Sequence, residues 1–268
     1  NSGQDASTFE ISRSILKVKH LLRDLKRYLS FAQLRRALGA AALLVGLSFA
    51  NNANGQNFLD KKENPFGLDT GSVVSMPSFV DLDGDGDFDV LMGEMQMEST
   101  YGYMGNGGWK YFENVGTANK PEFAAPKTNP FNLDTIGVLL KPAFADFDDD
   151  GDYDLLAGNS YLKADTTGLG LILVGRLLYF ENIGSATEPN FDVPIANPFG
   201  ADTSYYYSFP TIADLDDDGD YDVLVGEYYG NMEYYENIGT KESPEFAASI
   251  DLPFGIDHVY QLATPELA

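Results

Sequence analysis

The stretch PSFVDLDGDGDFDVLMGE, residues 77–94, places an aspartate-rich loop between two short apolar runs. The runs contain Phe79-Val80 on one side and residues 88–92 on the other, and their aromatic and branched residues predict strands. In the loop, residues 81–89, Asp stands at the first, third, fifth, seventh and ninth positions and Gly at the sixth. The basic unit expected from this stretch is therefore strand, acidic loop, strand.

The same stretch occurs two more times along the chain, as PAFADFDDDGDYDLLAGN (142–159) and PTIADLDDDGDYDVLVGE (210–227). We name the acidic loops loop 1 (81–89), loop 2 (146–154) and loop 3 (214–222). Each is followed by YFENVG (111–116), YFENIG (179–184) or YYENIG (234–239), and an NPFG-like turn begins at residues 64, 129, 197 and 252. Sequence motifs repeated in a constant order indicate an array of one supersecondary unit.

Each unit is expected to contain four short strands separated by Gly, Asn, Asp and Pro turns. In the first unit they fall at Phe79-Val80, 88–92, 110–113 and around 122–124, and no segment after residue 57 has a convincing helical period. In the third unit a tight hairpin is expected, with Gly230 at positive φ. Antiparallel four-stranded units arranged around an axis predict an all-β fold, a β-propeller. The alternative is a β-sandwich, which rarely repeats its sequence so faithfully.

The expected organisation has six parts. They are upstream residues with a signal-peptide helix (1–55), a linker (56–63), three complete blades (64–128, 129–196 and 197–251) and the start of a fourth blade (252–268).

The first part has the order of a secretory signal. Residues 17–36 are cationic, residues 37–50 (ALGAAALLVGLSFA) are uncharged and apolar, and a small polar stretch follows. As a helix the apolar run would rise about 21 Å, less than the roughly 30 Å of a bilayer core, so no permanent membrane span is expected. Cleavage after Ala50 or after Gly55 fits equally. The alternative is an amphipathic helix packed on the domain; otherwise the protein is secreted or on the cell surface.

The charge of the chain indicates which classes of partner it favours. Residues 57–268 contain 9 Lys/Arg and 38 Asp/Glu, a net charge of −29. Such a surface disfavours nucleic acid and favours cations. There is no Cys, which excludes disulfides and thiolate metal sites, and the two His are His20 and His258. Because no nucleophile elbow or phosphate loop occurs, an enzyme is not expected. Paired carboxylates could perform glycoside chemistry, but a metal accounts for the conspicuous ones.

The three loops are the predicted metal sites. Carboxylates at positions 1, 3, 5 and 9 can converge if the chain wraps around a centre, and position 7 is expected to contribute its backbone carbonyl. Hard oxygen ligands in a flexible loop favour calcium over magnesium, with about three Ca²⁺ in all. An EF-hand would need Glu at position 12, where Met92, Ala157 and Val225 stand. The alternative for any one loop is a solvated acidic turn. The predicted ligands are Asp81, Asp83, Asp85, Asp87, Asp89, Asp146, Asp148, Asp150, Asp152, Asp154, Asp214, Asp216, Asp218, Asp220 and Asp222.

With D-x-D-x-D-G-x-x-D between two strands, a spacing near 65 residues and the YFEN-x-G word, residues 64–268 resemble the FG-GAP/VCBS repeat family. The resemblance implies an integrin-α-like β-propeller with calcium in the loop that joins the first two strands of a blade. It implies metal roles for the loop positions above and for no other residue.

Taken together, these patterns predict a secreted or cell-surface calcium-binding scaffold for adhesion or for a protein or glycan ligand. The alternative is the non-catalytic propeller portion of a larger secreted enzyme. In an insertion at 95–108, Tyr101, Tyr103 and Met104 could form a ligand surface together with Trp109. Trp109 aligns with Leu177 and Met232, however, which favours a core strand position.

Overall fold

The computed structural model describes residues 65–68, 72, 74–97, 104–134, 136–164, 171–201 and 206–266. The predicted signal peptide and linker lie outside the described residues, as do Tyr101 and Tyr103. The chain divides into two units, Asn1–Lys61 and Lys62–Ala268, and every described residue belongs to the second. No helix among the described residues is long and apolar enough to cross a membrane.

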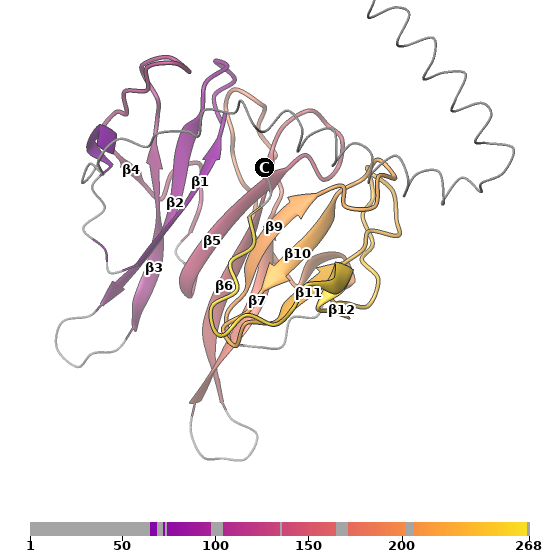
Figure 1. Cartoon of the computed structure of the whole chain (residues 1–268). Helices are drawn as coiled ribbons and strands as arrows, with labels where there is room; N and C mark the ends of the chain where they lie inside the picture. Colours follow the sequence, from indigo (N-terminus) through magenta and orange to yellow (C-terminus); the bar gives the residue numbers. More distant parts are fainter. Residues whose placement is uncertain are drawn as a thin grey trace, which may run out of the picture. The chain divides into compact units, whose positions relative to one another are not determined.

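The described residues form three four-stranded antiparallel sheets, each with its strands in chain order (Figure 1). Sheet 1 contains β1 (Val74–Val80), β2 (Asp89–Met97), β3 (Met104–Phe112) and β4 (Lys127–Thr128). Sheet 2 contains β5 (Val138–Ala145), β6 (Asp154–Ala164), β7 (Leu171–Phe180) and β8 (Ile195–Ala196). Sheet 3 contains β9 (Phe209–Ala213), β10 (Asp222–Gly226), β11 (Met232–Tyr235) and β12 (Ile250–Asp251). Three NPFG-like turns form single 3₁₀ turns, η2 (Pro65–Gly67), η3 (Pro198–Gly200) and η4 (Pro253–Gly255). The all-β prediction is confirmed.

Strand register brings each acidic loop to the same place in its sheet. Val80 pairs with Asp89, Ala145 with Asp154, and Ala213 with Asp222. Each loop therefore begins directly after the first strand, and its last Asp is the first residue of the second strand.

Alternating side chains pack neighbouring sheets together, as the period of two residues in a strand requires. One core joins sheets 1 and 2 and includes Leu91, Trp109 and Leu155. A second core joins sheets 2 and 3 through the opposite face of sheet 2 and includes Leu156, Leu177 and Val223. Sheet 2 is thus covered on both faces.

The fifth residue of the second strand of each sheet is a glycine, and it permits this close packing. A Cβ atom on Gly93 would lie 1.8 Å from the backbone oxygen of Leu140, and one on Gly158 would lie 1.9 Å from that of Ser208. Gly226 stands in the same relation to Ala263, at 2.1 Å. The following unit therefore approaches at positions where only glycine fits.

The predicted fourth strand of the first unit was misplaced. The structure has β4 at Lys127–Thr128, whereas Phe123 makes only an isolated bridge to Asn114. The Asn114 side chain accepts hydrogen bonds from the backbone N–H groups of Gly116 (3.1 Å) and Glu122 (3.0 Å). These bonds close residues 114–123 into a compact turn, so the chain pairs with β3 only after this turn, at β4. The hairpin of the third unit forms as predicted, with Gly230 at φ 89°.

Candidate metal centres

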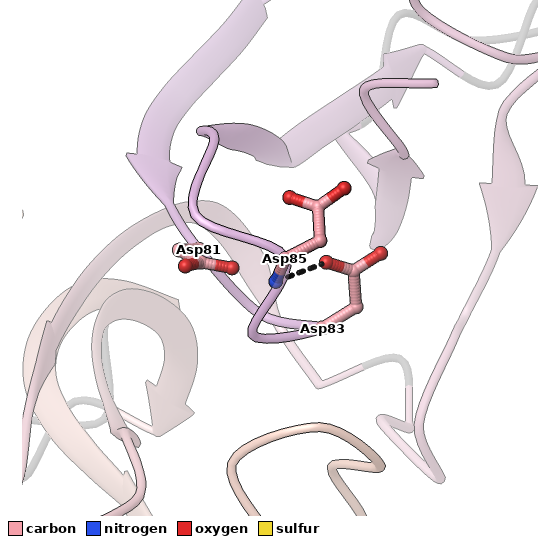
Figure 2. Close-up of side chains that lie close together, drawn as sticks. All are labelled: Asp81, Asp83 and Asp85. Carbon is pink, nitrogen blue, oxygen red and sulfur yellow. Dashed lines mark hydrogen bonds between the residues drawn. The ribbon is translucent and has the colours of Figure 1, made fainter. Parts of the chain in front are cut away.

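The first three alternate aspartates of each loop converge. In loop 1, carboxylate oxygens of Asp81, Asp83 and Asp85 lie within 4.8 Å of one another. Figure 2 shows these three side chains and the hydrogen bond from the Asp85 N–H to Asp83 Oδ1, at 3.3 Å. Loops 2 and 3 bring together their own sets, Asp146, Asp148 and Asp150, and Asp214, Asp216 and Asp218.

The carboxylate at position 1 wraps the loop. Asp81 accepts the N–H of Gly84 at Oδ1 (2.8 Å) and that of Gly86 at Oδ2 (3.0 Å). Asp146 accepts those of Asp150 (3.1 Å) and Gly151 (3.2 Å). Bonds of this kind, from side chain to nearby backbone, stabilise turns. The backbone of the loop therefore folds around the carboxylate at position 1.

Two positions of each loop have a left-handed backbone. At position 6, Gly86, Gly151 and Gly219 have φ of 92°, 97° and 104°. At position 4, Gly84, Asp149 and Asp217 have φ of 73°, 58° and 70°. Glycine and, less readily, aspartate adopt this conformation, so the bend predicted at the sixth residue is present.

The position 7 aspartates are buried close to the cluster. Asp87, Asp152 and Asp220 are 8%, 8% and 9% exposed, and the Oδ1 atom of each has no hydrogen-bond partner among the described residues. Burial, followed by the neighbouring carboxylates, raises the pKa of Asp152 and of Asp220 to about 6. A buried oxygen with no donor is costly, so a cation or water at this atom would offset that cost.

The position 9 aspartates are not part of the three-carboxylate clusters. Asp89, 1% exposed, accepts hydrogen bonds from the N–H groups of Leu82 (3.2 Å) and Asn114 (2.8 Å) and from the hydroxyl of Tyr111 (2.7 Å). Asp154 and Asp222 have the corresponding three partners. These carboxylates therefore fasten the loop to the third strand, and their predicted metal role stays a prediction.

The YFEN motif was not among the site residues predicted from the sequence. Its Tyr donates to the position 9 carboxylate, and its Asn supplies the N–H that binds the other oxygen of the same carboxylate. Burial, followed by the neighbouring loop carboxylates, raises the pKa of Asp87, and a hydrogen bond with the Asn114 side chain opposes this effect. The signal was the recurrence of a Tyr followed three residues later by an Asn after each loop, although the distance from the loop varies.

Trp109 belongs to the core. It is 0% exposed, its ring meets Phe180 edge-on at 6.3 Å, and its Nε1 donates to the backbone oxygen of Asp134 at 3.2 Å. The interpretation as a core strand position is confirmed, and Trp109 is excluded from the predicted ligand surface.

Comparison with known proteins adds no family here. No protein-family model and no curated protein matches the chain.

The donor groups of the loops are compatible with coordination of a hard cation. Each offers three convergent carboxylates and one buried carboxylate oxygen to which no described residue donates. Oxygen ligands in this number and on a flexible loop suit a divalent cation such as Ca²⁺.

Proposed function

We propose that loops 1, 2 and 3 each bind one calcium ion. The convergence of three carboxylates together with the buried Oδ1 of position 7 carries the proposal. Calcium takes six to eight oxygen ligands in irregular geometry, and carboxylates, backbone carbonyls and water can supply them. Magnesium requires near-ideal octahedral geometry and loses its bound water reluctantly, so these loops favour calcium.

We also propose that the three sheets are blades of a β-propeller of the FG-GAP/VCBS type. Three observations support it. The strand order is the same in every sheet, the first strands β1, β5 and β9 contact one another in sequence, and successive sheets pack through equivalent faces. Such packing, continued, turns about an axis.

In this proposal the protein is a secreted or cell-surface scaffold for adhesion or for a protein or glycan ligand, and calcium is structural. The signal-like residues 17–55 and the acidic composition support export and cation binding. Calcium-binding modules that work outside cells have dissociation constants on the order of 10⁻⁴ to 10⁻³ M. A fold that depends on bound calcium is compatible with a non-catalytic scaffold.

Isothermal titration calorimetry of the full chain tests the calcium sites. We expect about three calcium ions per chain and much weaker magnesium binding, since the loops suit calcium. Asp85→Asn, Asp150→Asn and Asp218→Asn each remove one cluster carboxylate and should each lower the stoichiometry by one. Asp192→Asn, at an exposed Asp outside the loops, is the matched control. Equal affinity for magnesium, or a stoichiometry that the loop variants do not change, would contradict the proposal.

A further inference from the structure

One face of sheet 1 carries apolar side chains that no other described sheet covers. Phe66, Phe79 and Phe88 are 57%, 61% and 64% exposed, and with Leu68 and Phe123 they line a cavity of about 430 Å³. We call these five side chains the front socket. Exposed aromatic groups gathered around a cavity mark an interaction surface.

Sheet 2 has the same socket, and there it is filled. The counterparts of Phe66, Phe79 and Phe123 are Phe131, Phe144 and Phe191, and they pack into the core shared with sheet 1. The side chains of sheet 1 that enter are Leu82, the second residue of loop 1, and Tyr111, whose ring lies 4.7 Å from that of Phe131.

Sheet 3 repeats the arrangement. Its socket contains Phe199, Ile212 and Phe246 and receives Phe147 and Tyr179 of sheet 2. The Tyr179 and Phe199 rings lie 4.9 Å apart. Two interfaces in one molecule thus identify the natural occupant of a front socket: the second loop residue and the third-strand tyrosine of another sheet of this repeat.

Sheet 3 presents such an occupant. Leu82 and Phe147 are each 2% exposed, whereas Leu215, the matching residue of loop 3, is only partly buried. Tyr234, the third-strand tyrosine of sheet 3, is covered by the turn η4, and the Phe254 ring lies 4.9 Å from its ring. Phe131 and Phe199 make the same contact with the third-strand tyrosine at the other two interfaces. The described residues after η4 contain no strand of a further sheet.

We propose that the front socket of one copy receives Leu215 and Tyr234 of a second copy. The turn η2 has the same Pro-Phe-Gly sequence as η4 and would replace it over Tyr234, an exchange of like for like as in domain swapping. Docking would also bury Phe66 and Phe79, which supplies a hydrophobic driving force. Asp81 and Asp87, which are assigned to calcium, line the same cavity, so the contact is tested with calcium present.

The proposed contact is head-to-tail, because the two copies use different surfaces. Each copy keeps one free socket or one free Leu215, so further copies can add. The full chain should therefore form concentration-dependent assemblies larger than a dimer.

Sedimentation velocity of the full chain in calcium buffer at about 1 to 100 µM tests the proposal, a range that reveals micromolar association. Phe66→Asp disables the socket, and because Phe66 has φ 61°, Asp is tolerated by the backbone there. Leu215→Asn disables the opposite surface without adding charge beside loop 3. Each variant should associate at least tenfold more weakly. An equimolar mixture of the two should stop at a dimer, since each variant retains the surface that the other lacks.

The control is Val193→Asp, at a side chain that is 80% exposed and outside the socket, and it should associate as the parent chain does. Circular dichroism establishes that all variants are folded. A parent chain that stays monomeric would overturn the proposal. So would assembly that is unchanged by Phe66→Asp, which would come from another surface such as residues 37–50, or a mixture of folded variants that does not form the dimer.

Discussion

Leu252 occupies a left-handed backbone conformation for which its side chain is unsuited. Its φ is 47°, close to the 45° of Asn129 and the 48° of Asn197, the residues at the same place in two other NPFG-like turns. Those Asn side chains also accept a backbone N–H from the third strand, that of Trp109 (3.1 Å) and that of Leu177 (3.2 Å). Leucine provides neither the backbone tolerance nor the acceptor.

We therefore expect Leu252→Asn to stabilise the protein by about 1 kcal/mol, by relieving left-handed strain and by offering an acceptor near β11. Asn197→Leu should destabilise it by at least as much. Urea unfolding of both variants measures these changes. Leu252→Ala is the control, since alanine relieves neither cost; an equal gain in that variant would assign the effect to loss of the exposed leucine.

At the scale of the element, each acidic loop contains two kinds of carboxylate. Those of positions 1, 3 and 5 gather at the cluster, whereas that of position 9 accepts three hydrogen bonds and is 1% exposed in Asp89, Asp154 and Asp222. The position 4 residue Asp149 is different again, as it pairs with Lys241 of the following unit at the surface. Within one loop, one set of carboxylates gathers where a cation could bind, and another carboxylate is bound by the sheet.

This division makes a prediction that separates the two roles. Asp154→Asn places an amide N–H₂ against one or more N–H and O–H donors, and we expect a loss of about 2 kcal/mol or more even in excess chelator. Asp150→Asn should reduce stability in calcium but raise it slightly in chelator, because it removes one of the mutually repelling carboxylates. Asp149→Ala should cost less than about 1 kcal/mol in either buffer, as exposed ion pairs do. Thermal and urea unfolding, each with calcium and with chelator, provide the comparison. Equal losses for Asp154→Asn and Asp150→Asn in chelator would show that position 9 has no separate structural role.

At the scale of the whole molecule, unrelieved negative charge opposes folding. The chain has a net charge of −24, and carboxylate oxygens in each cluster lie within 4.8 Å of one another. Repulsion at such a distance costs about 1 kcal/mol per pair even at the dielectric constant of water. A cation bound by the folded loops would reverse this contribution, and because the unfolded chain does not gather the ligands, its binding energy would stabilise the fold.

Chelation should therefore lower the melting temperature of the full chain, and molar NaCl should restore only part of the loss, because screening removes repulsion without supplying coordination. The measurement is differential scanning calorimetry in calcium, in chelator, and in chelator with NaCl. One melting temperature in all three conditions would mean that the sheets are stable without the cation. Full recovery in NaCl would attribute the effect to charge alone.

Local features of this protein could be predicted from its sequence. The alternating aspartates, the glycine at position 6 and the short apolar runs determine a strand, a wrapped loop and a strand, because dihedral preferences and side-chain period act over neighbouring residues. The convergence of Asp81, Asp83 and Asp85 is equally local, since a bent loop brings alternate side chains together. The repeated order of words predicted three equivalent four-stranded sheets for the same reason.

Features that depend on distant residues were decided by tertiary structure. Asp89 is bound by Tyr111 and Asn114, which follow it by 22 and 25 residues, and only the pairing of β2 with β3 brings them to it. Burial of the position 7 carboxylates likewise arises from packing, and the turn closed by Asn114 moved β4 beyond its predicted place. Whether a front socket is filled depends on a neighbouring sheet, because burial is a property of two surfaces and a repeat sequence describes each surface alone.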